Sequence, residues 1–208
     1  MRDRAMKHLS ILTVLTFTGG CAVTAPYLTH VRDRVSADGL PITLCLAVDL
    51  DPGVVSDVQD AAWAWNLMLG RAYFKLGCKV GPVPLPGRVT RPKDASIYIG
   101  RIERAQFSNP INIGWAHTWA GGANAPGVRG YVWVAEDVKE PRRKNVMTHE
   151  LGHVLGLGHV ERWVSNDNLV MHPIAQLTDW HHIDEAAVCA VKALWEDREA
   201  AEKGGFCD

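Results

Sequence analysis

One short segment of the sequence carries residues that could hold a metal ion and use it. Residues 148–160 read THELGHVLGLGHV, so that His149 and His153 are four positions apart and Glu150 follows the first histidine. On a helix, two histidines at this spacing lie on one face, one turn apart, and can bind a single zinc ion. Gly156 would let the chain leave the helix, and His159 would return as a third ligand. Three protein ligands leave the fourth tetrahedral position open to water, which is typical of a catalytic zinc site.

A bare H-E-x-x-H also occurs by chance on surface helices, but the added glycine and third histidine make the motif far more specific. The segment resembles the motif of the metzincin clan of zinc peptidases, H-E-x-x-H-x-x-G-x-x-H followed by a methionine turn. Residues 168–173 read NLVMHP, and this Met-x-Pro form is similar to the matrixin branch. The resemblance implies that Met171 lies beneath the zinc site as an apolar floor.

The resemblance implies a zinc-dependent endopeptidase with one catalytic zinc ion, held by His149, His153 and His159. Glu150 would take a proton from the zinc-activated water and then deliver it to the leaving amine. Two alternatives stay open: an exported zinc-binding module without turnover, and a zinc hydrolase that acts on a non-peptide substrate. Glu150 argues against the first alternative, because a module that only binds zinc does not need this carboxylate.

Hydrophobic patterns predict the elements that would position the motif. Strands are expected at 42–48, 95–102, 114–119 and 130–135, and a loop with at most a short strand at 79–92. A long amphipathic helix is expected at 54–74, ended by Gly77, and the zinc-binding helix at 141–155. A last helix is expected from Thr178, as its N-cap, to about Glu202.

This order of elements resembles the metzincin arrangement. The resemblance implies an α+β fold: a twisted, mostly parallel sheet with two long helices, then a small C-terminal subdomain with the Met-turn and a final helix. Residues 116–119, which are Ala116, His117, Thr118 and Trp119, correspond to the edge strand above the family's cleft. An extended peptide or protein substrate can add to such an edge as a further strand. The usual histidine partners of His117 in a structural zinc site are missing, so no second zinc is expected, and no calcium-ligand pattern is readable.

The first residues predict export. Residues 1–20 combine a basic start with a short apolar run, as a signal peptide does. Small residues before Cys21 resemble a bacterial lipobox, which implies lipidation of Cys21 and an outer-membrane lipoprotein; the alternative is a plain secretory signal and a secreted or periplasmic protein. Residues 21–40 would be a linker and residues 41–208 the metzincin-like peptidase domain.

Composition and cysteine content agree with a single exported domain. The net charge of −1 suggests no nucleic-acid partner, and a monomer is expected. Apart from Cys21 there are four cysteines, an even number that suggests two disulfides in an exported protein. Three pairings are possible among Cys45, Cys78, Cys189 and Cys207.

Overall fold

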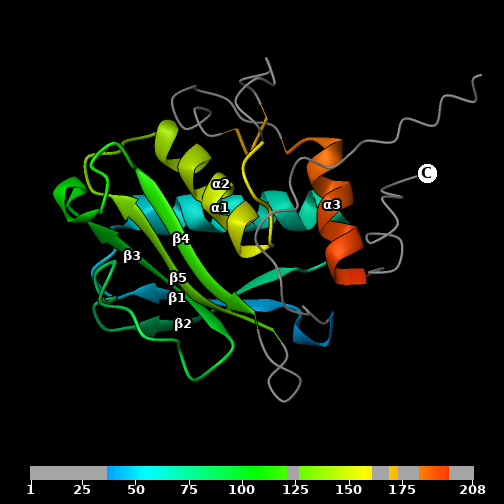
Figure 1. Cartoon of the computed structure of the whole chain (residues 1–208), viewed down its shortest axis with the longest axis horizontal. Helices are drawn as coiled ribbons and strands as arrows, with labels where there is room; N and C mark the ends of the chain where they lie inside the picture. The colour runs from blue at the N-terminus through cyan, green and yellow to red at the C-terminus, as the bar shows by residue number, and fades with distance from the viewer. Residues whose placement is uncertain (1–36, 121–126, 161–168, 173–182, 197–208) are drawn as a thin grey trace, which may run out of the picture.

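A mostly parallel sheet forms one layer of the molecule, and the described helices lie on one side of it (Figure 1). The computed structural model describes residues 37–120, 127–160, 169–172 and 183–196. The sheet has the strand order β2-β1-β3-β5-β4, and all neighbours are parallel except β4, which runs antiparallel to β5 at one edge. The strands are β1 (Ile42–Ala47), β2 (Phe74–Val80), β3 (Ser96–Ile102), β4 (Gly114–Ala120) and β5 (Val128–Ala135). The predicted mostly parallel sheet is confirmed.

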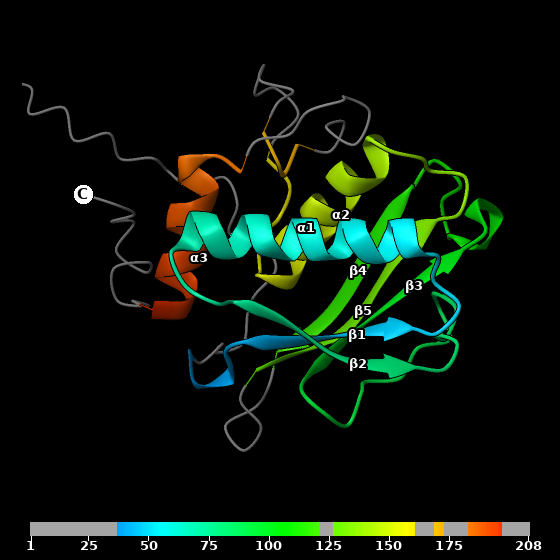
Figure 2. The same cartoon turned by 180° about the vertical axis from the view of Figure 1, so that it is seen from behind.

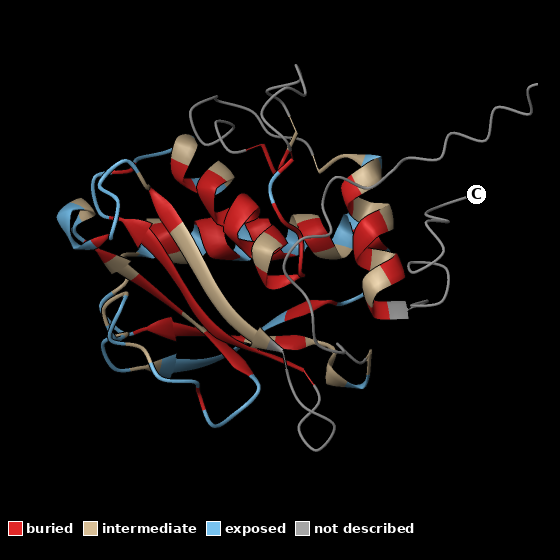
Figure 3. Cartoon of the chain, in the orientation of Figure 1, coloured by how far each residue is buried: buried red, intermediate tan, exposed pale blue. Residues whose placement is uncertain are grey.

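Two long helices, α1 (Pro52–Leu69) and α2 (Arg142–Val154), lie on one face of the sheet. Figure 2 shows a third helix, α3 (Glu185–Glu196), beside the C-terminal end of α1. Short 3-10 turns occur at Ala37–Gly39 and Arg104–Gln106. Buried residues line the layer where the helices meet the sheet (Figure 3). Within the described residues, no helix combines the length and the hydropathy of a membrane span.

Helix α1 ends earlier than its hydrophobic pattern predicts. Asp51 caps its start by accepting a hydrogen bond from the Val54 amide at 2.9 Å. Gly70 ends it with a φ of 73°, a left-handed conformation that glycine adopts without strain. The expected helix end at Gly77 is therefore wrong, because Gly77 lies inside β2.

The strand β2 (Phe74–Val80) begins at the last residue of the predicted helix and ends just inside the predicted loop at 79–92. The side chain of Asn66 in α1 turns the chain into this strand: its Oδ1 accepts from the amides of Tyr73 and Phe74 at 2.8 and 2.9 Å. Its Nδ2 donates to the Phe74 carbonyl at 2.9 Å. A disulfide between Cys45 and Cys78 then ties β2 to β1. Cys189 is also disulfide-bonded, whereas Cys207 lies outside the described residues.

Helix α2 is held on α1 by one buried ion pair and one buried hydrogen bond. Arg143 pairs with Asp57 of α1, and both side chains are almost fully buried. Farther along, the indole of Trp65 in α1 donates to the Thr148 carbonyl at 2.9 Å. These contacts fix the segment that carries the predicted zinc ligands.

Helix α3 begins later than predicted and packs on the end of α2. Asp184 caps its start by accepting from the Ala187 amide at 2.9 Å, and Trp195 donates its indole N–H to the Leu155 carbonyl at 3.0 Å. The helix therefore starts at Glu185; Thr178 lies outside the described residues.

Candidate metal centre

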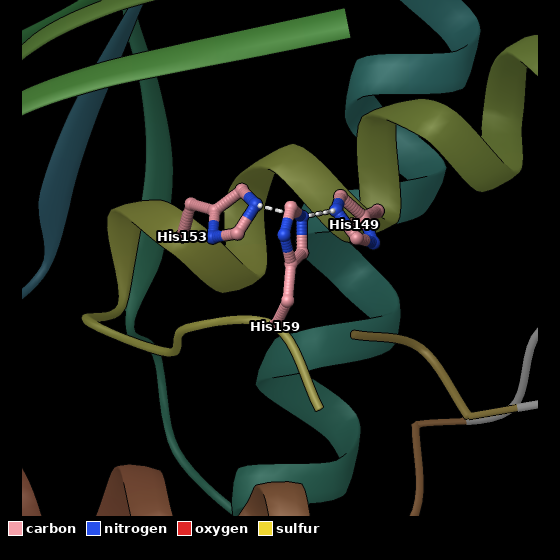
Figure 4. A group of neighbouring side chains, drawn as sticks. All are labelled: His149, His153 and His159. Atoms are coloured by element: carbon pink, nitrogen blue, oxygen red, sulfur yellow. Dashed lines mark hydrogen bonds between the residues drawn. The ribbon is translucent and has the colours of Figure 1, made fainter. Parts of the chain in front are cut away.

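Three histidine side chains converge at the end of α2 (Figure 4). His149 and His153 lie one turn apart on α2, and His159 comes from the segment that follows the helix. The Nε2 atom of His159 lies 3.1 Å from the Nε2 atoms of both His149 and His153. The possible ligand atoms of the three rings all lie within 4.8 Å of one another. His149 is fully buried, His153 is half-buried and His159 is exposed.

The return of His159 depends on a tight turn at Gly156. The Gly156 amide donates to the His153 carbonyl at 3.0 Å, and the Leu157 amide donates to the Gly152 carbonyl at 3.1 Å. Gly156 has a φ of 98°, a conformation that other residues adopt only under strain. The turn therefore ends α2 and sends the chain back across its last turn, as the sequence predicted from Gly156.

Backbone carbonyls fix how two of the rings are turned. The Nδ1 atom of His149 lies 2.6 Å from the Val170 carbonyl, and the Nδ1 atom of His153 lies 2.7 Å from the Leu157 carbonyl. A carbonyl can only accept, so each Nδ1 carries the hydrogen and each Nε2 keeps a lone pair. Metal-binding histidines in proteins are usually oriented in this way by a hydrogen bond from the second ring nitrogen.

The arrangement of lone pairs suits a cation. His159 Nε2 faces two acceptor nitrogens at equal distance, and a neutral imidazole cannot donate one well-aligned hydrogen bond to both. Tetrahedral zinc with zinc–nitrogen bonds of about 2.0–2.1 Å separates its nitrogen ligands by about 3.3–3.4 Å, close to the observed spacing. Three imidazoles are also a donor set that zinc prefers. The residues present therefore fit a zinc ion.

Met171 lies under the end of α2, next to the residue whose carbonyl orients His149. It is fully buried, and its backbone carbonyl accepts from the Val160 amide at 3.1 Å. A Cβ added to Gly152 would lie 2.4 Å from Met171 Sδ and 3.2 Å from a ring carbon of Trp65. Glycine at position 152 thus lets the helix backbone approach the methionine closely.

An open cleft of about 560 Å³ runs past the histidine cluster. One wall is formed by Asn112 and by residues 114–118 of β4, and the other by Glu150, His153, Leu157 and His159. The carboxylate of Glu150 lies against Gly114 of β4, and Glu150 is only 2% exposed. The cleft therefore brings the predicted base and two of the predicted ligands to the same surface.

The predicted edge-strand residues divide between the cleft and an aromatic cluster. Ala116, His117 and Thr118 line the cleft, whereas Trp119 is absent from the lining and packs against the rings of His117 and Tyr131 at centroid distances of 4.2 and 6.3 Å. Burial lowers the pKa of His117, so this imidazole stays neutral to a lower pH than a free histidine. Cys21 lies outside the described residues.

Several residues that shape the site were not predicted from the sequence. Asn112 and Leu157 line the cleft, and the Val170 and Leu157 carbonyls orient the ligands. The Leu157 contact could have been expected from a helix that ends at Gly156, because the chain must then turn back over the last helical residues. The position of Asn112 in the cleft and the contact between the Val170 carbonyl and His149 join segments that are distant in sequence, so no local sequence pattern predicts them.

No model of a known protein family matches this chain, and no curated protein sequence matches it. Among solved structures, the chain is similar to the crystal structure of archaemetzincin from Methanopyrus kandleri, with 18% sequence identity and a TM-score of 0.45. The match covers 78% of this chain and 94% of that chain. An overlap this low assigns no activity to this chain.

Proposed function

We propose that this protein is a zinc-dependent endopeptidase. The main support for a zinc site is the direction of the hydrogen bonds. The Nδ1–H groups of His149 and His153 donate to backbone carbonyls, so the Nε2 atoms of these two rings are acceptors, and both face Nε2 of His159. Hydrogen bonds among these three nitrogens cannot satisfy them all, whereas one metal ion can.

A zinc ion bound there would supply a Lewis acid that polarises a carbonyl and lowers the pKa of water to about 7. Among the described residues that line the cleft, Glu150 supplies the carboxylate that could move the proton. Its carboxylate is buried at the cleft wall next to the first ligand, within the same turn of α2. It would accept a proton from the attacking water and give it to the nitrogen of the leaving amine, so that it ends the cycle ionised as it began.

The shape of the cleft supports a peptide as the substrate. The strand β4 lies at the edge of the sheet and pairs on one side with β5; among the described strands, none pairs with its other side. Residues 114–118 of this strand line the cleft, so an extended peptide could pair with the side of β4 that no described strand covers, while its carbonyl lies near the histidines. A small non-peptide substrate would not need such an edge.

Cleavage of a generic protein substrate by the zinc-loaded protein tests this proposal. We expect hydrolysis that stops with a chelator and returns when zinc is added back, together with internal cleavage of library peptides by mass spectrometry. Glu150→Ala is the matched control, because it keeps the three histidines and removes the base. Zinc binding without cleavage of any peptide would contradict the proposal and leave the zinc-binding module or a non-peptide hydrolase.

We also propose that the chain is exported and anchored by a lipid on Cys21. The basic start and apolar run of residues 1–20 support export, and the Cys45–Cys78 disulfide suits an oxidising compartment. If Cys21 is lipidated, the protein should partition into detergent, and Cys21→Ser should move it to the soluble fraction. Equal partitioning of the two forms would contradict the anchor.

A further inference from the structure

We propose that Gly114 is a positioning residue for the general base, because the missing side chain at this position makes the space that the Glu150 carboxylate occupies. The inference rests on the proposed function of Glu150. It concerns a residue on a different element, β4, far from the histidine motif in sequence.

The contact between the two residues is close. A Cβ built on Gly114 would lie 2.4 Å from Glu150 Oε1 and 3.0 Å from Glu150 Cδ. It would also lie 2.6 Å from Val146 Cγ1, the residue one helical turn before Glu150 on the same face of α2. Ordinary contacts of a Cβ begin at 3.4 Å, so any side chain at position 114 would take volume that the carboxylate now fills.

Backbone conformation does not explain the glycine. Gly70 and Gly156 have positive φ angles, which favour glycine at these turns, but Gly114 is the first residue of β4 and its φ is outside that region. The close approach of the Glu150 carboxylate and of the Val146 side chain is therefore the physical reason for glycine at this position.

The size of the expected effect follows from the distances. To reach 3.4 Å from a new Cβ, Glu150 Oε1 must move by about 1.0 Å, the difference from 2.4 Å. Glu150 is 2% exposed and helix α2 is held by α1, so the carboxylate itself must shift rather than the helix. Misplacing a catalytic group by about 1 Å can cost on the order of 10²-fold in rate.

The experiment compares Gly114→Ala with Gly81→Ala in the zinc-loaded full chain. Gly81 is a matched control, because its added Cβ meets no atom within 4 Å, its φ is also not positive, and it does not line the cleft. Gly114→Ala should keep the parent zinc content and a KM near the parent value, while kcat falls about 10²-fold. Gly81→Ala should change none of these.

Two double variants separate positioning of the base from simple packing. Adding Val146→Ala to Gly114→Ala removes the clash with the valine and leaves the clash with the carboxylate, so kcat should stay low even if the fold is fully restored. Adding Glu150→Asp instead withdraws the carboxylate by one methylene. In the Glu150→Asp background, Gly114→Ala should lower kcat by much less than 10²-fold. Such non-additive effects are expected of residues in contact.

The outcomes distinguish the inference from the proposed function. If the zinc-loaded parent hydrolyses no peptide, the proposed function fails. If the parent is active and Gly114→Ala is as active as Gly81→Ala, the positioning role is overturned. If Gly114→Ala loses zinc or unfolds, the variant with Val146→Ala decides: restored folding with full activity overturns the role, and restored folding with low kcat supports it.

Discussion

Removal of the disulfide between β1 and β2 should lower the free energy of unfolding by an amount that can be worked from the chain. Cys45 and Cys78 are separated by 33 positions, so the bridge closes a loop of 34 residues. In the chain-entropy description, a loop of this length loses about 12.6 cal/mol/K in the unfolded state, which is about 3.8 kcal/mol at 25 °C. Both cysteines are changed to alanine, because a serine at the fully buried position 45 would bury a hydroxyl.

Urea denaturation of the parent and the double alanine variant measures this difference. A chelator in both samples removes any stabilisation by bound metal, which would otherwise add to the stability of both. We expect the loss of about 3.8 kcal/mol to come with a larger dependence on urea, because the unfolded chain without the bridge exposes more surface. Zinc affinity should stay the same, since neither cysteine lines the cleft.

A loss below about 1 kcal/mol, with an unchanged urea dependence, would refute this reasoning. It would mean that the parallel ladder between β1 and β2 and the hydrogen bonds from Asn66 hold the edge strand without help from the bridge. The disulfide of Cys189 is present in both proteins and therefore does not affect the comparison.

Three further predictions concern the site. Glu150→Ala should keep about one zinc ion per chain and lose about 10²–10⁴-fold of activity, whereas His153→Ala should lose the zinc. Metal analysis and peptide hydrolysis measure both effects. Equal zinc contents in the two inactive variants would contradict the assignment of His153 as a ligand and Glu150 as the base. Gly152→Ala should cost about 1–3 kcal/mol in urea denaturation, because its Cβ would lie 2.4 Å from Met171 Sδ; an unchanged midpoint would show that the methionine moves freely. Because burial lowers the pKa of His117 below its unfolded value, its contribution to stability should be present above about pH 6.5 and be lost as the pH falls. His117→Gln should remove that part of the pH dependence in chelator, and parallel curves for the two proteins would argue against it.

The histidine cluster could be predicted because its chemistry is local in sequence. Two ligands follow helical spacing, and the third follows a glycine whose positive φ ends the helix. The central strands were also predictable, since β1 and β5 are buried along nearly their whole lengths, and their residues 44–47 and 131–135 read as continuous apolar segments.

The strand β2 was not predicted, although residues 74–80 read FKLGCKV and alternate between apolar residues and Lys or Gly. The apolar spacing of α1 runs on past Gly70, and this helical pattern concealed the start of the strand. The strand also lies at an edge of the sheet, and most of its residues are exposed. The roles of Gly114 and Gly152 were also hidden. What a glycine makes room for depends on neighbours from other elements, here Glu150 and Met171.

The hydrogen bond from the Val160 amide to the Met171 carbonyl links two of the histidine ligands through the backbone. It joins the chain at 3.1 Å, one residue after His159 and one residue after Val170, whose carbonyl orients His149. The segment that supplies the third histidine is therefore tied to the segment that orients the first. A change that moves either segment should reach both histidines, so the two ligands should respond to it together rather than one at a time.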